Sequence, residues 1–256
     1  MKITMTDSEL LETLRRKEWF YRFELPSGEV LPSRTPDHVA AIHPTRLAML
    51  MEALKPVAAK GWGGLSVIDI ACHQGYFASH LARMGCREVL GVDARQEHVD
   101  DCALIGRAYG LDNLRTLRSD LFNLDPGQVG QFDITLLFGL LYHVENPVGA
   151  LRIARSLTRK VCVVETQIAP GMTGYMDWGS HQYVKKIQGS FALIDESEEL
   201  HGPEMSVTGI CLCPSLDALV WIMKKIGFAR VELIEPSPDA YEQHRFGKRA
   251  VVAGYC

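Results

Sequence analysis

The sequence predicts an α/β fold built on a parallel β-sheet that helices cover on both faces. From residue 61 onward, short and almost continuous apolar runs alternate with stretches of helical periodicity. Strands that are buried on both faces have such unbroken apolar runs, and helices between them supply the crossovers that parallel strands need. The runs that we expect to form the first strands span residues 65–71, 88–93, 114–119, 132–138 and 161–165.

The residues before this alternation predict a helical and hairpin segment. Thr6 and Glu9 have capping-box spacing, and leucines recur at helical intervals from there to Lys17. Residues 19–31 alternate around a Pro-Ser-Gly turn, which favours a short hairpin. A second helix is expected over 43–59, before the glycines at 61, 63 and 64 break the pattern.

The rest of the chain completes the alternation after one long interruption. Helices are expected at 78–84, 96–109, 147–157 and 214–227, and strands at 231–234 and 249–255. Residues 167–213 break the rhythm, and a loop of that length within a compact domain is typically functional or a lid. We therefore predict a flap over 1–60 and a main domain over 61–256 with an inserted lid at 167–213.

Composition and charge narrow the class of protein. The 256 residues are 47% hydrophobic and carry 27 Lys and Arg against 31 Asp and Glu, a net charge of -4. Such a chain can bury a core, whereas a nucleic-acid partner would require a local basic patch. The basic residues within 152–160 are spaced as on a solvated helix whose end carries cations, so a nucleic-acid partner is not expected.

The cysteines and the apolar runs exclude further classes. Seven cysteines are an odd number without paired zinc-site spacing, and His201 and Glu204 do not complete a ligand set with Cys211 and Cys213. We expect no metal. Apolar runs stay well short of the ~20 residues of a membrane span. The expectation is a cytoplasmic protein with no membrane contact, and the sequence leaves a homodimer open.

The most specific local pattern is a buried strand that enters a tight turn and then a helix, from Val67 to Phe77. Small residues in such a turn let a nucleotide-like ligand approach the backbone, and the helix N-terminus offers free N–H groups. A dinucleotide fingerprint has three glycines, whereas this chain keeps Gly75 and has Ala71 and His73 at the other positions. The match to a dinucleotide site is therefore poor.

Three acids, Asp69, Asp93 and Asp120, lie at the ends of successive expected strands. A carboxylate at the position of Asp93 suits a ribose diol, because it can accept a hydrogen bond from both hydroxyls. Together the acids would repel a pyrophosphate and favour a ligand that carries positive charge. The structural alternative is that Asp69 and Asp93 only cap turns at strand ends.

This constellation resembles the class I S-adenosylmethionine-dependent methyltransferases, strongly over 65–167 and more loosely beyond. The resemblance implies a Rossmann-like, doubly wound, seven-stranded and mostly parallel sheet with an antiparallel last strand. It implies that the loop after Asp69 wraps the methionine part of the cofactor. It also implies that Asp93 binds the ribose, that Asp120 meets the adenine amine and that 138–140 run under the sulfonium. The cofactor-binding residues so assigned are Asp69, Ala71, His73, Gly75, Asp93, Ala94, Asp120, Leu121, Phe138 and Gly139.

Two features refine the resemblance. Alanine is tolerable at the close approach of position 71, whereas His73 must point away from the cofactor or hydrogen-bond to it. The Leu141-Tyr142-His143 string and the Glu165-Thr166 strand end are similar to one branch of the family. That branch contains bacterial tRNA wobble-uridine carboxymethyltransferases and small-molecule methyltransferases of biosynthetic clusters. The resemblance does not identify the acceptor.

Methyl transfer from a sulfonium is an in-line displacement, so the protein has to align the acceptor and exclude water. A base is needed where the acceptor must lose a proton. His143, at the exit of the fourth strand, is placed for that role because imidazole titrates near neutral pH. The alternative is that His143 caps the following helix. Tyr142 is the second candidate catalytic residue, to orient substrate or simply to pack.

Candidate substrate residues lie on both sides of the expected sheet edge. The 167–213 segment supplies an aromatic and histidine set suited to a flat or cationic small molecule, although each member could instead pack inward. Arg46 could pair with a substrate carboxylate or with an acid of the protein itself. The residues proposed are Tyr21, Arg46, Tyr175, Trp178, His181 and Tyr183.

The leading hypothesis is methyl transfer to an oxygen or nitrogen of a small molecule, with S-adenosylmethionine as cofactor, in a biosynthetic pathway. A tRNA-modifying carboxymethyl- or methyltransferase is one alternative. The excess of acidic over basic residues argues against it. Another is a reaction of the methionine arm, such as internal cyclisation, which would release methylthioadenosine. A binding or scaffold protein without turnover is the non-enzyme alternative, for which the departures at Ala71 and His73 leave room.

Overall fold

A seven-stranded sheet forms the centre of the computed structural model, which describes residues 6–256 apart from 178, 180–183, 197–205 and 207. The strand order is β10-β11-β5-β4-β1-β2-β3. Its strands are β1 (Ser66–Ile70), β2 (Glu88–Asp93), β3 (Leu114–Arg118), β4 (Phe132–Phe138), β5 (Thr158–Gln167), β10 (Arg230–Ile234) and β11 (Arg249–Tyr255). Strand β11 is antiparallel to both β5 and β10, and the other pairings are parallel. The predicted mostly parallel sheet with an antiparallel last strand is confirmed.

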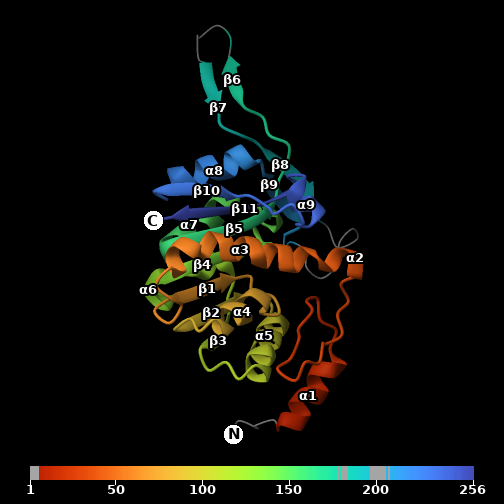
Figure 1. Cartoon of the computed structure of the whole chain (residues 1–256). Coiled ribbons are helices and arrows are strands. Elements are labelled where there is room, and N and C mark those ends of the chain that lie inside the picture. Colours follow the sequence, from red (N-terminus) through yellow and green to blue (C-terminus); the bar gives the residue numbers. More distant parts are fainter. Residues whose placement is uncertain (1–5, 178, 180–183, 197–205, 207) are drawn as a thin grey trace.

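Helices cover both faces of this sheet (Figure 1). On one face lie α3 (Ile42–Ala58), α4 (Tyr76–Arg83) and α5 (Gln96–Ala108), and on the other α7 (Pro147–Leu157) and α8 (Leu216–Lys225). Two neighbouring residues of β1 illustrate this covering. Val67 packs into the core on one face of the sheet, and Ile68 packs into the core on the other face. Both are fully buried. The unbroken apolar runs of the sequence arise because each face of each central strand meets a helix layer.

The N-terminal segment packs against the first helix layer. Helix α1 (Asp7–Arg16) begins with the predicted capping box between Thr6 and Glu9. The expected hairpin over 19–31 is reduced to isolated bridges, with Leu31 N–H donating to the Phe23 carbonyl. Its alternate aromatics are buried against α4, where Tyr21 stacks on Tyr76 at 4.8 Å between ring centroids. Burial of aromatic rings therefore fixes this segment more than a strand ladder does. Helix α2 (Asp37–Ala40) leads into α3.

Residues 167–213 contain regular structure where the sequence indicated only a loop. Two antiparallel hairpins form there, β6 (Gly174–Asp177) with β7 (Val184–Ile187), and β8 (Phe191–Asp195) with β9 (Ile210–Pro214). The first extends away from the body of the molecule (Figure 1). Its strands expose most of their side chains, so they lack the apolar signal of a buried strand.

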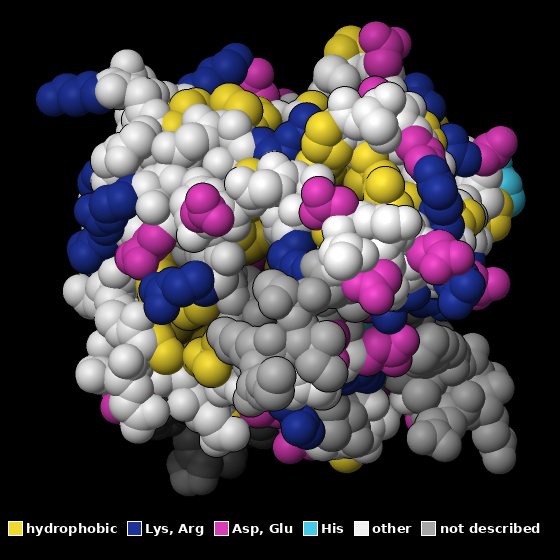
Figure 2. Space-filling model, turned by 90° about the horizontal axis from the view of Figure 1, so that it is seen from below, with side chains coloured by type: hydrophobic (Ala, Val, Ile, Leu, Met, Phe, Trp, Pro, Cys, Tyr) yellow, Lys and Arg dark blue, Asp and Glu magenta, His cyan; other side chains and the backbone are white. Residues whose placement is uncertain are grey.

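Short elements complete the chain at the rims of the sheet. They are the 3₁₀ turns η1 (Leu121–Asn123) and η2 (Leu141–His143) and the helices α6 (Pro126–Val129) and α9 (Glu242–Arg245). Among the described residues, no helix has both the length and the apolar character needed to cross a membrane. On the face seen in Figure 2, Lys and Arg side chains are interspersed with Asp and Glu.

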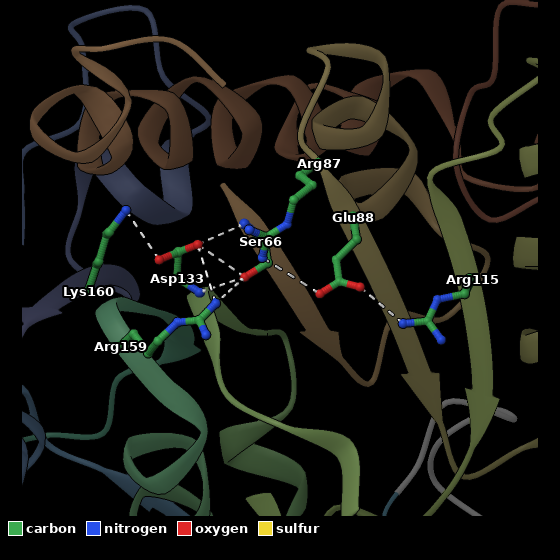
Figure 3. Close-up of polar contacts among 7 residues, drawn as sticks. All are labelled: Ser66, Arg87, Glu88, Arg115, Asp133, Arg159 and Lys160. Carbon is green, nitrogen blue, oxygen red and sulfur yellow. Dashed lines mark hydrogen bonds and ion pairs between the residues drawn. The ribbon is translucent and has the colours of Figure 1, made fainter. Parts of the chain in front are cut away.

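Three of the basic side chains within 152–160 make contacts inside the fold. At the amino-terminal edge of the sheet, Asp133 accepts hydrogen bonds from the N–H and hydroxyl of Ser66 and pairs with Arg159 and Lys160 (Figure 3). Arg155 donates to the Gly227 carbonyl and lies over the Phe228 ring. Arg159 and Lys160 of β5 thus join β4 and β1 through Asp133 and Ser66, which weakens the case for an RNA-binding patch.

At the opposite edge, a buried carboxylate joins four elements. Glu165 of β5 is fully buried and pairs with Arg249 of β11 at 2.6 Å, Arg46 of α3 at 2.9 Å and His244 of α9 at 3.3 Å. Burial alone would raise the pKa of Glu165, but the charges of Arg249 and Arg46 outweigh it and hold the pKa well below its ordinary value.

Glu165→Gln should therefore lower the free energy of unfolding by about 3–5 kcal/mol, because it leaves two buried guanidinium groups without a counter-charge. Urea unfolding measures this change. The control Glu88→Gln removes an exposed pair with Arg115 and should cost less than about 1 kcal/mol. Since the folded-state pKa of Glu165 is depressed, its contribution is present above the unfolded-state pKa and lost on acidification. Equal losses in the two variants would contradict the assignment.

Candidate active site at the carboxyl edge of the sheet

A cavity of about 310 Å³ lies at the carboxyl ends of the parallel strands. The ends of β1, β2 and β4 supply Ile70, Asp93 and Phe138, and η1 and η2 supply further walls. The N-terminal segment and the insertion after β5 also reach it. Of the residues predicted from the sequence, twelve line the cavity: Tyr21, Arg46, Ala71, His73, Asp93, Ala94, Asp120, Leu121, Phe138, Gly139, Tyr142 and His143.

The loop after β1 has a left-handed backbone at three alternate residues. Ala71, His73 and Gly75 have φ of 60°, 50° and 81°. A non-glycine residue in this region costs roughly 1–2 kcal/mol. The chain thus keeps the backbone of a glycine-rich loop although two of its three positions have side chains. Glycine is required at 75, because a Cβ there would lie 2.5 Å from Cys102 Sγ of α5.

Gly75 itself differs from its predicted role. It precedes the first residue of α4 and is not among the residues that line the cavity. Its contact with Cys102 brings α4 close to α5 and so shapes the loop from behind. Of the three left-handed residues, Ala71 and His73 thus line the cavity, whereas Gly75 packs against α5.

His73 contributes both its backbone and its ring to the cavity wall. Its N–H donates to Asp93 Oδ2 at 3.0 Å. The ring packs on His98 at 3.9 Å and on Phe20 at 5.3 Å between centroids. Burial, followed by the proximity of His98, lowers the pKa of His73 to about 3, so the ring is neutral at physiological pH.

Asp93 is an ionised carboxylate held at the end of β2. Besides the His73 N–H, it accepts the N–H of Arg95 at 3.0 Å and lies 3.2 Å from His98 Nδ1. Burial opposes ionisation, but these hydrogen bonds outweigh it and lower the pKa of Asp93. Asp93 thus caps a turn, as the structural alternative proposed, and it also lines the cavity.

The other two acids behave differently. Asp120 accepts the N–H of Phe122 at 2.8 Å, which starts η1, and it lines the cavity. Asp69 lies within β1 behind the wall, only 1% exposed, and is not a lining residue. Burial raises the pKa of Asp69 to about 7, against the opposing effects of the Ala78 N–H and Arg46. The structure brings Asp93 and Asp120 to the cavity and keeps Asp69 beneath it.

Arg46 adopts the second of its two anticipated roles, since it pairs with an acid of the protein, Glu165. Its guanidinium lies over the rings of Phe77 and Phe138 at 5.0 and 5.6 Å. A Cβ at Gly139 would lie 2.8 Å from Arg46 Nη2, so glycine lets the strand exit pass close to this cation. Arg46 still lines the cavity, and its Nε has no hydrogen-bond partner among the described residues.

Tyr142 and His143 also line the cavity. The Tyr142 hydroxyl accepts a hydrogen bond from Arg249 Nη2 at 3.1 Å. The Nδ1 atom of His143 lies 2.6 Å from Glu196 Oε2. Helix α7 is capped by Asn146, whose Oδ1 accepts the Gly149 N–H, so His143 is not its cap. Burial lowers the pKa of His143, and Glu196 partly opposes that shift.

Of the predicted lid residues, Tyr175 is described by the structure, and it does not join this cavity. Tyr175 is 73% exposed on β6 and is absent from the cavity lining. Trp178, His181 and Tyr183 lie outside the described residues, as do His201 and Glu204. From this insertion, Ser206 and Thr208 reach the cavity instead.

Several lining residues were not predicted, chiefly Arg95, His98, Ser206 and Thr208. His98 could have been found, because it lies in the first turn of the helix that follows Asp93. Within the described residues, His143, Glu196 and Cys211 also place ligand atoms within 4.8 Å of one another, as a metal site would require. Sequence spacing gave no sign of that cluster, since its members are far apart in the chain.

Comparisons with known proteins agree with this geometry. A family described as a methyltransferase domain matches residues 43–233, well over half of the chain. A tRNA U34 carboxymethyltransferase of Desulfotalea psychrophila is 26% identical over 186 residues, 71% of this chain and 51% of that protein. A ubiquinone biosynthesis O-methyltransferase of Acinetobacter baylyi is 27% identical over 118 residues, 46% of this chain and 47% of that protein. The chain spans about half the length of these relatives.

Solved structures share the whole fold. The N-terminal domain of EvdMO1, crystallised in the presence of SAH and D-fucose, superposes with a TM-score of 0.68 at 21% identity over 98% of both chains. Magnesium protoporphyrin IX methyltransferase of Synechocystis with bound SAH gives 0.56 at 16% identity, over 87% of this chain and 88% of that one. The chain therefore belongs to the methyltransferase domain family.

Proposed function

We propose that this protein transfers the methyl group of S-adenosylmethionine to an oxygen or nitrogen of a small molecule in a biosynthetic pathway. The observation that carries the proposal is one cavity lined by two unlike sets of residues. Ionised Asp93 and Asp120 form one set, and Tyr142 and His143 form the other. Such a cavity can hold a nucleoside against the acids and an acceptor against the histidine.

The residues fit the cofactor group by group. Asp93 offers a carboxylate to the ribose hydroxyls, while Asp120 and Leu121 border the space for the base. Arg46 offers its free Nε to a carboxylate, of the cofactor's methionine arm or of the acceptor. Phe138 and Gly139 line the cavity at the exit of β4, where the sulfonium would lie. The loop at Ala71 and His73 lets the backbone approach the methionine arm.

When bound, the cofactor supplies an electrophilic methyl group on a positively charged sulfur. The protein's part is to align the acceptor, exclude water and take up the acceptor's proton. Nε2 of His143 is the ring nitrogen left for that proton, since Nδ1 is held by Glu196. Phe20 and Tyr21 from the flap of residues 1–60, and Ser206 and Thr208 from the lid of 167–213, close the cavity around the acceptor.

A small acceptor is favoured over tRNA by size and charge. A cavity of about 310 Å³ is at the lower end of the range for small-molecule sites. The net charge is -4, and Arg159 and Lys160 are paired with Asp133. The likeness to tRNA U34 carboxymethyltransferases keeps tRNA as the second candidate, and it covers only half of those proteins. Tight, salt-sensitive tRNA binding would favour that candidate.

Asp93→Asn should weaken the binding of S-adenosylhomocysteine about 10- to 100-fold, because a hydrogen bond to a charged group contributes about 1.5–3 kcal/mol. Isothermal titration calorimetry measures this. Asp112→Asn, which removes an exposed acid from the turn before β3, is the matched control and should bind normally. Unchanged affinity in Asp93→Asn would sink the assignment of the ribose site.

His143→Ala should keep its affinity for S-adenosylhomocysteine and lose turnover by about 100-fold or more, because general-base catalysis typically contributes that much. The assay supplies cofactor with an isotope-labelled methyl group and a metabolite extract, and follows label in the products. Methyl transfer releases S-adenosylhomocysteine, whereas reaction of the methionine arm releases methylthioadenosine. Normal turnover of His143→Ala would reduce the residue to a structural one, and methylthioadenosine as the product would replace methyl transfer.

A further inference from the structure

A buried glutamate from the insertion lies directly behind His143. Glu196 follows β8, 53 residues after His143 in the chain, and the residue is 7% exposed. One oxygen, Oε2, accepts from His143 Nδ1 at 2.6 Å, from the Ser206 N–H at 2.8 Å and from Cys211 Sγ at 3.3 Å. A buried carboxylate with several donors is ionised and fixed in position.

These contacts determine which nitrogen of the imidazole carries the proton. A carboxylate can only accept, so the short contact requires a proton on His143 Nδ1. The neutral ring then has its lone pair on Nε2. His143 lines the cavity and its side chain is 19% exposed, which leaves Nε2 as the nitrogen available to a ligand.

We propose that Glu196 is a positioning residue that holds His143 in the Nδ1–H tautomer, so that Nε2 faces the acceptor as a proton acceptor. The proposal rests on the proposed function and deepens it. As the acceptor's lone pair bonds to the methyl carbon and the carbon–sulfur electron pair returns to sulfur, the acceptor's proton moves to Nε2. The imidazolium that forms is stabilised by the Glu196 carboxylate. The acceptor class is therefore a hydroxyl or amine that must lose a proton.

The surrounding charges define how His143 should titrate. Burial lowers the pKa of His143, Arg249 and Arg95 lower it further, and Glu196 raises it. The Tyr142 ring packs against the imidazole at 4.1 Å between centroids. Burial also raises the pKa of Cys211 to about 11, which keeps that thiol protonated. The negative charge of Glu196 thus stabilises the protonated form of His143 and opposes the lowering of its pKa.

The same three side chains could be mistaken for a metal site, since their ligand atoms cluster within 4.8 Å. Their hydrogen-bond pattern favours the pair of Glu196 and His143. Both His143 and Cys211 donate to one carboxylate oxygen, whereas metal ligation requires a thiolate and a free nitrogen lone pair. A metal-binding role is an outcome that the experiment below can reveal.

The direct test is nuclear magnetic resonance of histidine labelled with ¹⁵N in the protein bound to S-adenosylhomocysteine. The His143 signals are assigned by their loss in His143→Ala. In the wild type we expect a protonated Nδ1 and an unprotonated Nε2. In Glu196→Gln we expect a lower His143 pKa and a loss of the tautomer preference. Glu196→Asp, which keeps the charge, should restore part of both.

Activity supplies the second readout, with labelled cofactor and the metabolite extract. Glu196→Gln should reduce turnover by about 10- to 100-fold, less than the loss of the base itself, and shift the acid limb of the pH profile to lower pH. Asp195→Asn, which removes a charge from the exposed neighbouring residue, should leave the rate, the profile and the tautomer unchanged. Circular dichroism verifies that each variant folds.

Three results would overturn the proposal. A protonated Nε2 in the wild type, or a His143 tautomer and pKa unchanged by Glu196→Gln, would remove the positioning role while the proposed methyl transfer stood. Loss of activity with a chelator and its recovery with Zn²⁺ or Mg²⁺ would replace the pair by a metal site. Failure of the wild type to bind S-adenosylhomocysteine would instead contradict the proposed function.

Discussion

The buried carboxylate of Glu165 is the interaction on which the site depends. It holds Arg46, Arg249 and His244 from three other elements at the carboxyl edge of the sheet. Arg249 in turn donates to the Tyr142 hydroxyl, and Arg46 crosses the exit of β4 at Gly139. The carboxylate of Glu165 therefore positions Arg46 in the cavity wall directly. Through Arg249 and Tyr142 it also positions η2, the turn that carries His143. The N-terminal segment packs on the same helix α3, where the rings of Tyr21 and His43 lie 4.6 Å apart between centroids.

Much of the fold could be predicted because the sheet is covered on both faces. This covering forces apolar residues at every position of the central strands, as Val67 and Ile68 show, and the sequence records it directly. The cavity acids were also predictable, since the ends of parallel strands meet at one edge. Asp93 and Asp120 are there, whereas Asp69 and Gly75 lie behind the wall. Which side of a turn a residue faces depends on helix packing that no local pattern encodes.

The contact between Glu196 and His143 was less predictable, for a physical reason. Glu196 and His143 meet only because the insertion folds back on η2, where Leu212 N–H donates to the Val144 carbonyl. Such a contact between distant segments leaves no periodicity in the sequence. The hairpin of β6 and β7 was missed because its strands bury little apolar surface, and the aromatic Tyr175 that suggested a pocket is exposed instead.

The left-handed turn at Ala71 and His73 has a consequence for how tightly the loop is held before any ligand arrives. Glycines there would give the unfolded chain more conformations to lose, whereas alanine and histidine restrict it. The His73 ring is also wedged between Phe20 and His98. The loop at Ala71 and His73 should therefore become little more ordered when a ligand binds. We expect this loop to add only a small conformational-entropy penalty to the binding free energy.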